Sequence, residues 1–431
     1  MSSLDPSEWP DVAEAATIVH LRELIFDRLV ILDGKGQPQP GLAVAWEHDP
    51  QYQTWQFKLR PAVKWQDGSP LTPQDVLSSL AGSAPNGAVQ LSVADSLEFK
   101  MSEPRPDLLT TLATDPGWMI RRPPVISSDA LPVGTGPFRL TAWEAGRHVV
   151  LQAYDDYWGG RPYIDGIEVQ MGRSSRDQLL DLGLDKADIV ELDPGEGRRA
   201  QQEGRRVWIS APVELLSLRF DLNKPAVQDR RLREAIAGCI DRAAIQKVLF
   251  QNYGEGTGSI FPNWVSGYAF LFSTAMDLAG GRQMTAEIGT PPTLKLGYDS
   301  NDALARQTAE RIAVNARDVG VTMQVSPLPQ GWRRMPDTRT DLRVERIRID
   351  RPTLITAYRQ AALGLGFPIS GAEQNPEFIY GVEQKFLETL TVVPLAYAPE
   401  LMGLGSRVKD WSALPWGAWR LENLWLEAAK P

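Results

Sequence analysis

Arginines crowd one stretch of the chain, where their side chains could bind an acidic ligand. Seven lie within twenty residues: Arg333, Arg334, Arg339, Arg343, Arg346, Arg348 and Arg351. A guanidinium can hold a carboxylate or a phosphonate through two parallel hydrogen bonds. The candidates for such a contact are Arg333, Arg346 and Arg348. The alternative is that these arginines are solvated on the outer face of a strand and its loops.

Aromatic side chains could form the apolar walls of the same site. The chain contains 14 Trp, and aromatic faces provide a large contact area at a low cost in conformational entropy. Trp332 lies beside the arginines in the sequence, and Trp264 and Tyr268 are further candidates. We expect most of the other Trp residues to belong to the core.

The sequence contains no clear set of catalytic residues. Asp155 with Asp156, or Glu345 with Asp350, could serve as the carboxylate pair of a glycosidase, but with 54 Asp and Glu residues such pairs also arise by chance. The 3 histidines have no partner at metal-ligand spacing, and no Gly-x-Ser-x-Gly elbow is present. We therefore expect a protein that is not an enzyme, with no metal site and no cofactor.

A strand, a helix and a second strand must position part of the site. Apolar residues alternate over residues 294–298, recur at helical spacing over 302–319 and return as a strand at 321–325. Such a βαβ unit belongs in a parallel sheet, where ligands approach the carboxyl ends of the strands. Tyr298 and Asp299 lie at such an end and are therefore candidate ligand contacts.

Other patterns predict architecture. Residues 229–250 have the spacing of one amphipathic helix, with Cys239 on its apolar side. Residues 55–59 alternate as a half-buried strand, and Thr72 and Asp75 form a capping box.

Two loops could be mistaken for ligand sites. The segment Gly134-Thr135-Gly136-Pro137 lacks a following Gly-Lys-Ser/Thr, and Pro137 has no N–H to give a phosphate, so we interpret it as a turn. The segment 155–158 places aromatic rings beside carboxylates, as a sugar site would. A packed loop is the favoured interpretation.

Composition limits the class of protein. A chain of 431 residues is long for one core and suggests two or three domains. A net charge of −9 disfavours nucleic acid as a partner. No apolar run is long enough to span a membrane, and no signal peptide is evident at the N-terminus.

Several short sequence segments, in the same order along the chain, resemble those of the extracellular solute-binding proteins of family 5. These are the capture subunits of peptide, opine and nickel-chelate ABC importers. The N-terminal phrases are residues 29–33, 40–47, Trp55-Gln56-Phe57-Lys58-Leu59-Arg60 and Trp65-Gln66-Asp67-Gly68 with the residues up to Val76. Later phrases are residues 132–138, 156–162, 229–236, 393–396 and 424–426. The middle of the chain, roughly residues 266–390, matches poorly.

The resemblance implies an α/β protein with the type II periplasmic-binding-protein fold, in which two lobes are joined at a hinged cleft and a subdomain is inserted. On that pattern residues 1–44, 166–258 and 395–431 form lobe I, residues 45–165 form the inserted subdomain, and residues 259–394 form lobe II.

It also implies the function. We expect a substrate-binding protein that captures a small-molecule or peptide solute and delivers it to the permease subunits of an ABC transporter. We expect it to be a monomer in the periplasm or elsewhere outside the cytoplasm, with its signal peptide removed. The alternatives are the ligand-sensing domain of a regulator and, less favoured, a glycoside-active enzyme.

One site residue follows from the resemblance alone. In peptide-binding members, an Asp that follows Gly-Trp in the second lobe pairs with the α-ammonium group of the ligand. Asp350 lies at the corresponding distance from the start of its strand, although Arg346 and Ile347 stand where Gly and Trp would be. The other interpretation is that Asp350 pairs with Arg348 or Arg351 at the surface.

Overall fold

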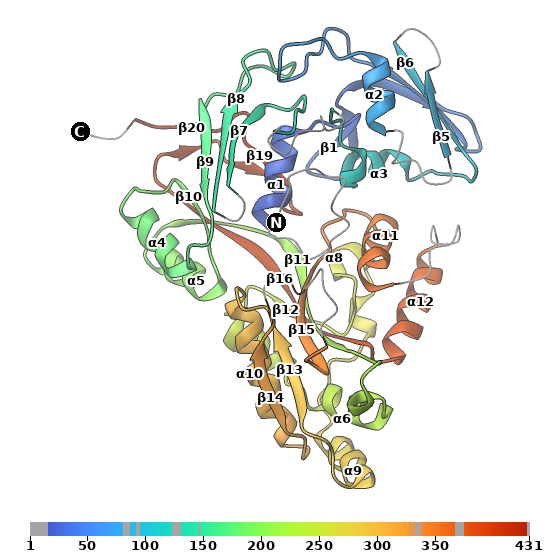
Figure 1. Ribbon diagram of the computed structural model, residues 1–431, viewed down its shortest axis with the longest axis vertical. Helices are drawn as coiled ribbons and strands as arrows, with labels where there is room; N and C mark the ends of the chain where they lie inside the picture. The colour runs from blue at the N-terminus through green and yellow to red at the C-terminus, as the bar shows by residue number, and fades with distance from the viewer. Residues whose placement is uncertain are drawn as a thin grey trace. The chain divides into compact units, whose positions relative to one another are not determined.

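The chain folds into two compact units. The computed structural model describes residues 16–80, 87–91, 95–122, 131–144, 147–329, 332, 338–366 and 375–428 (Figure 1). The first unit comprises residues 1–190, 351–356 and 404–431, and the second comprises residues 191–350 and 357–403. The chain therefore passes between the units more than once. The lobe boundaries given above stay a prediction; residues 191–258, which they assign to lobe I, belong to the second compact unit.

The first unit contains several small antiparallel sheets. A four-stranded sheet has the order β3-β4-β6-β5 and a three-stranded sheet the order β7-β8-β9. Their strands are β3 (Ala43–His48), β4 (Thr54–Leu59), β5 (Gly87–Leu91), β6 (Ser96–Met101), β7 (Phe138–Glu144), β8 (His148–Ala153) and β9 (Gly166–Gln170). Two-stranded sheets pair β1 (Val30–Leu32) with β2 (Pro38–Pro40), β17 (Val408–Lys409) with β20 (Trp425–Leu426), and β18 (Ser412–Ala413) with β19 (Trp419–Arg420). The helices are α1 (Ala16–Ile25), α2 (Pro73–Leu80), α3 (Leu108–Thr114) and α4 (Ser175–Gly183).

Local predictions in the first unit are confirmed. In β4 the buried Trp55, Phe57 and Leu59 alternate with more exposed residues. The backbone N–H of Asp75 donates to Oγ1 of Thr72 at 3.2 Å, and the backbone N–H of Thr72 donates to Oδ2 of Asp75 at 2.8 Å, which is the expected capping box at the start of α2.

Both loops are packed, as expected. A Cβ on Gly134 would lie 2.0 Å from the carbonyl oxygen of Ile25, so only glycine fits this turn before β7. The side chains of Tyr157 and Trp158 donate hydrogen bonds of 3.2 and 2.7 Å to the carboxylate of Asp27. These two aromatic residues therefore anchor the loop to the unit.

The second unit is built on one mixed sheet with the order β10-β16-β11-β15-β13-β14 and β12 paired to β16. Its strands are β10 (Ile189–Glu191, whose first two residues belong to the first unit), β11 (Arg206–Phe220), β12 (Glu255–Gly256), β13 (Leu294–Tyr298), β14 (Met323–Pro327), β15 (Leu342–Arg348) and β16 (Val392–Leu404, whose last residue belongs to the first unit). Its helices are α5 (Pro194–Gln202), α6 (Arg230–Cys239), α7 (Arg242–Ala244), α8 (Asn263–Ser266), α9 (Leu278–Ile288), α10 (Ala303–Arg317), α11 (Leu354–Leu365, whose first residues belong to the first unit) and α12 (Pro376–Glu388).

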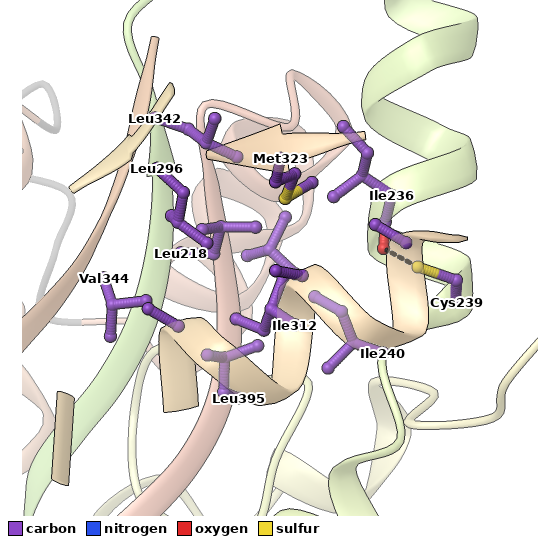
Figure 2. Packing of buried hydrophobic residues seen from close by; sticks show 14 of the residues in the cluster. Leu218, Ile236, Cys239, Ile240, Leu296, Ile312, Met323, Leu342, Val344 and Leu395 are labelled. Atoms are coloured by element: carbon purple, nitrogen blue, oxygen red, sulfur yellow. Dashed lines mark hydrogen bonds between the residues drawn. The ribbon is translucent and has the colours of Figure 1, made fainter. Parts of the chain in front are cut away.

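The core of this unit lies between the sheet and the helices α6 and α10 (Figures 1 and 2). The predicted βαβ unit is confirmed, because β13 and β14 are parallel and α10 connects them. Cys239 is fully buried beside Ile236 and Ile240, and burial raises the pKa of its thiol to about 12. The prediction that this thiol is a core residue is therefore confirmed.

The prediction of a single helix over residues 229–250 is wrong. The helix begins as expected, with Asp229 accepting a hydrogen bond from the backbone N–H of Arg231 at 2.9 Å, but α6 ends at Cys239. Ile240 is extended, and the carboxylate of Asp241 caps a new helix by accepting from the backbone N–H of Ala244 at 2.9 Å. An Asp side chain that bonds the local backbone competes with helix continuation.

Candidate functional site

The predicted arginines lie on β15, where an apolar strand face becomes charged. Side chains alternate between the two faces of a strand, so Leu342, Val344, Arg346 and Arg348 share one face. Leu342 and Val344 belong to the core. Arg346 and Arg348 follow where that core ends, and β11 places Glu214 opposite Arg348.

Arg348 is held between two carboxylates. Its Nε donates to Oδ2 of Asp350 at 2.5 Å, and its Nη1 donates to Glu400 of β16. The side chains of Arg348, Asp350 and Glu400 are only 4, 7 and 5% exposed. Asp350 thus pairs with Arg348, as one interpretation has it, but the pair is buried and does not lie at the surface. Gln360 of α11 also donates to Oδ1 of Asp350, at 3.0 Å.

Arg346 makes a similar bridge and is more accessible. Its terminal nitrogens donate to Oε2 of Glu214 and to Oδ1 of Asp302, both at 2.9 Å. The side chain of Arg346 is 32% exposed and that of Asp302 is 18% exposed. Burial lowers the pKa of Arg346, but Asp302 and Glu214 raise it by more, so this guanidinium stays charged.

This group of six side chains, the β15 cluster, carries more negative than positive charge. It consists of Arg346, Arg348, Glu214, Asp302, Asp350 and Glu400. Two guanidinium groups against four carboxylates leave two negative charges when all are ionised. Burial raises the pKa of Glu214, and Arg346 opposes that shift only in part. Counted by themselves, these six side chains therefore favour an added cation or proton over an added anion.

Tyr298, Asp299 and Trp332 lie together at the carboxyl end of β13. The indole Nε1 of Trp332 donates to Oδ2 of Asp299 at 3.2 Å, and the backbone N–H of Asp302 donates to the carbonyl oxygen of Asp299 at 3.0 Å. The turn after β13 therefore links these residues to the β15 cluster through Asp302.

Trp264 and Tyr268 occupy a different part of the second unit. The indole of Trp264, on α8, donates to the carbonyl oxygen of Pro212 at 2.8 Å. The ring of Tyr268 packs edge-on against Tyr380 of α12, with 5.3 Å between centroids. No ring or hydrogen-bond contact in the described residues joins Trp264 or Tyr268 to Arg346 or Arg348. Arg333 lies outside the described residues.

The Tyr268 hydroxyl lies beside a buried carboxylate, Glu383. This side chain is fully buried and accepts hydrogen bonds from Oγ of Ser259 at 2.7 Å and from the backbone N–H of Ile260 at 2.6 Å. Burial raises the pKa of Glu383 to about 7 despite those donors. Burial and the carboxylate together raise the pKa of Tyr268.

Four members of the site were missed from the sequence: Glu214, Asp302, Gln360 and Glu400. A signal did exist for two of them, because Glu400 is the one charged residue of its strand and Glu214 lies within the apolar stretch 211–216 of its own. A charge inside an apolar strand must have a partner, since burying it alone is costly. The sequence could not show which partner that would be.

Solved structures share this fold. The chain superposes on NikA from Staphylococcus aureus in complex with Ni(L-His)2 with a TM-score of 0.83 and 18% identity, over 99% of this chain and 98% of that one. It also superposes on MoaA from A.tumefacien R10 in complex with mannopinic acid with a TM-score of 0.83 and 20% identity, over 99% and 97% of the two chains. The expected α/β, type II periplasmic-binding-protein fold is confirmed. None of the helices among the described residues is long and apolar enough to cross a membrane.

Similar sequences are peptide-binding proteins. The dipeptide-binding protein of Escherichia coli (strain K12) is 23% identical over 57% of this chain and 54% of its own length. A putative ABC transporter peptide-binding protein of Brucella ovis is 26% identical over 69% of this chain and 62% of its own. The matched region thus spans less than two thirds of the length of either relative. The model of bacterial extracellular solute-binding proteins, family 5 Middle, matches residues 37–358. The chain therefore belongs to family 5 of the bacterial extracellular solute-binding proteins.

Proposed function

We propose that this protein is the solute-capture subunit of an ABC importer. The observation that carries the proposal is the family match over residues 37–358. The protein would act without catalysis, outside the cytoplasm and as a monomer, and would deliver its solute to permease subunits. Capture of this kind needs only that the solute stabilise one conformation of the protein over another.

The charge balance of the β15 cluster favours a solute that carries an amine. Its carboxylates outnumber its guanidinium groups, and an ammonium group would reduce the excess negative charge. The more exposed members, Arg346 and Asp302, are the ones that such a solute reaches first. Short peptides and amine-bearing conjugates are therefore the proposed solutes.

Thermal unfolding in the presence of dipeptide and opine libraries tests the proposal. A solute that binds only the folded protein stabilises it in proportion to the logarithm of the solute concentration. Native mass spectrometry of the freshly purified protein adds an independent search for a retained solute. Steady product formation from a solute identified in this way, abolished by a single carboxylate substitution, would contradict the proposal.

The substitution Asp350→Asn tests the amine contact. If Asp350 helps to hold the ammonium group, the loss of its charge weakens binding by about 2–5 kcal/mol in a calorimetric titration. The matched control is Glu345→Gln, because Glu345 is an ion-paired carboxylate on the opposite face of β15. Both variants lose fold stability, so affinity is the readout that separates them. Binding by Asp350→Asn within threefold of the native protein would remove Asp350 from the site.

A further inference from the structure

A separate cavity lies in the second unit, away from the β15 cluster. It has a volume of about 390 Å³ and lies between α6, α12 and the first residues of β16. Its walls are mostly apolar and include Ala237, Phe272, Leu387, Leu390, Val392 and Pro394. Pro394 and Glu400 are six residues apart on β16, which corresponds to about 20 Å along a strand. The cavity is therefore distinct from the cluster.

One guanidinium, that of Arg242, lines this apolar cavity. The residue is 8% exposed, and its Nε donates to the carbonyl oxygen of Pro394 at 2.9 Å. Within the described part of the chain, its two terminal nitrogens make no hydrogen bond and no carboxylate lies within ion-pair distance. Burial lowers the pKa of Arg242 to about 10, so the side chain remains a cation at neutral pH.

Arg233, another buried arginine of the second unit, shows by comparison which hydrogen-bond acceptors Arg242 lacks. Arg233 is 7% exposed and, like Arg242, has no ion-paired carboxylate among the described residues. Its terminal nitrogens, however, donate to three backbone carbonyls, those of Val227, Gln228 and Thr389, at 2.8, 2.9 and 3.2 Å. The terminal nitrogens of Arg233 are thus satisfied by the fold itself. Arg242 has one such acceptor, the carbonyl oxygen of Pro394, and both residues line the cavity.

The break between α6 and α7 determines where Arg242 lies. Asp241 caps the new helix and Arg242 is the first residue after that cap. In a continuous helix, residue 242 would have followed Cys239 in the direction of α6. The extended Ile240 changes the chain direction, and Arg242 lies beside Pro394 in the lining of the cavity.

We propose that this cavity is a second binding site, which takes a monocarboxylate with an apolar body and holds its carboxylate on the free fork of Arg242. The fork presents parallel N–H donors that match a carboxylate, and the walls match an alkyl or aromatic body. Glu388 lies at the rim and is exposed. Its negative charge disfavours ligands with a second carboxylate. This site goes beyond the proposed solute capture and does not depend on it.

Calorimetric titration of the native protein with octanoate tests the site, with octanol and octylamine as matched probes. Octanoate binds, and both matched probes bind at least about tenfold more weakly because neither supplies a carboxylate. Arg242→Gln lowers the affinity for octanoate by about tenfold or more. Glu388→Gln raises that affinity about twofold, since an exposed charge at the rim is largely screened.

A variant that leaves Arg242 unchanged tests the site even if substitution of this buried residue unfolds the protein. Ser273 is exposed and lines the cavity, so Ser273→Trp fills its mouth. The control is Leu271→Trp, at an exposed position two residues away that does not line the cavity. We expect Ser273→Trp to abolish octanoate binding and Leu271→Trp to leave it unchanged. The proposal is overturned if octanoate does not bind, if octanol binds equally well, or if Ser273→Trp binds octanoate like the native protein. The last result would place octanoate elsewhere, such as the solute site.

Discussion

The second unit buries carboxylates in two surroundings that differ in how the negative charge is balanced. In the β15 cluster, Asp350 and Glu400 lie against the guanidinium of Arg348. On α12, Glu383 is surrounded by neutral donors, among them Ser259 and the backbone N–H of Ile260. The neutral donors leave the pKa of Glu383 raised to about 7, so this second carboxylate gains or loses its charge near neutral pH.

The largest expected effect comes from removing the shared cation. Arg348→Met leaves Asp350 and Glu400 buried without a guanidinium and should lower the free energy of unfolding by about 3–5 kcal/mol. Urea denaturation measures this loss. Adding Asp350→Asn and Glu400→Gln to the same chain should recover most of it, because no unpaired charge then remains. A loss below about 1 kcal/mol in the single variant would show that water reaches these carboxylates.

Glu383 should make stability depend on pH in the opposite sense to an ion-paired carboxylate. Its pKa rises from 4.5 when unfolded to about 7 when folded, so the folded state binds the extra proton between those values. Glu383 makes its full contribution to the free energy of unfolding below pH 4.5. That contribution falls by about 3 kcal/mol as pH rises to 7. Glu383→Gln should remove this part of the pH dependence and stabilise the protein above pH 7.

The measurement is the difference between the unfolding free energies of the native protein and Glu383→Gln at a series of pH values. Other titrating groups are common to both proteins and cancel in that difference. A difference that is constant from pH 4.5 to 7 would contradict the raised pKa of Glu383.

The smallest effect is expected where the same ion-pair chemistry lies in water. Arg306 and Glu310 on α10 pair at 2.9 Å, with side chains 61 and 52% exposed. Glu310→Gln should change the free energy of unfolding by no more than about 0.5 kcal/mol. Circular dichroism during urea unfolding checks this value. A loss as large as that of Arg348→Met would mean that burial is not what distinguishes the two pairs.

Local periodicity predicted much of the fold. The strand, helix and strand over residues 294–325 were predictable because the apolar residues alternate in the strands and recur at helical spacing in the helix. These patterns are local and can be identified without knowing any distant contact. The break in the predicted helix over residues 229–250 was not predictable. An Asp at position 241 is compatible both with the exposed surface of a continuous helix and with the N-cap of a new one, and the sequence does not distinguish the two. Only the tertiary packing of Ile240 shows that the chain turns there.

The candidate site was predictable only in part. The sequence pointed to Arg346, Arg348 and Asp350, and the alternation of β15 places both arginines on one face. Their partners come from distant strands: Arg346 and Glu214 are 132 residues apart in the sequence. The register between β11 and β15 decides that pairing, and no local pattern encodes a register between strands so far apart.

The position of β16 has a consequence for the order of folding. This strand contains residues 392–404, every one of them buried, and lies between β10 and β11, whose residues are made roughly 170 to 200 positions earlier. During synthesis, β10 and β11 therefore emerge long before the strand that separates them. Until residue 404 is available, the facing edges of β10 and β11 have unpaired backbone groups, which is the arrangement that slows folding and exposes a chain to aggregation. The second unit is thus completed only once β16, the last of its strands along the chain, has been made.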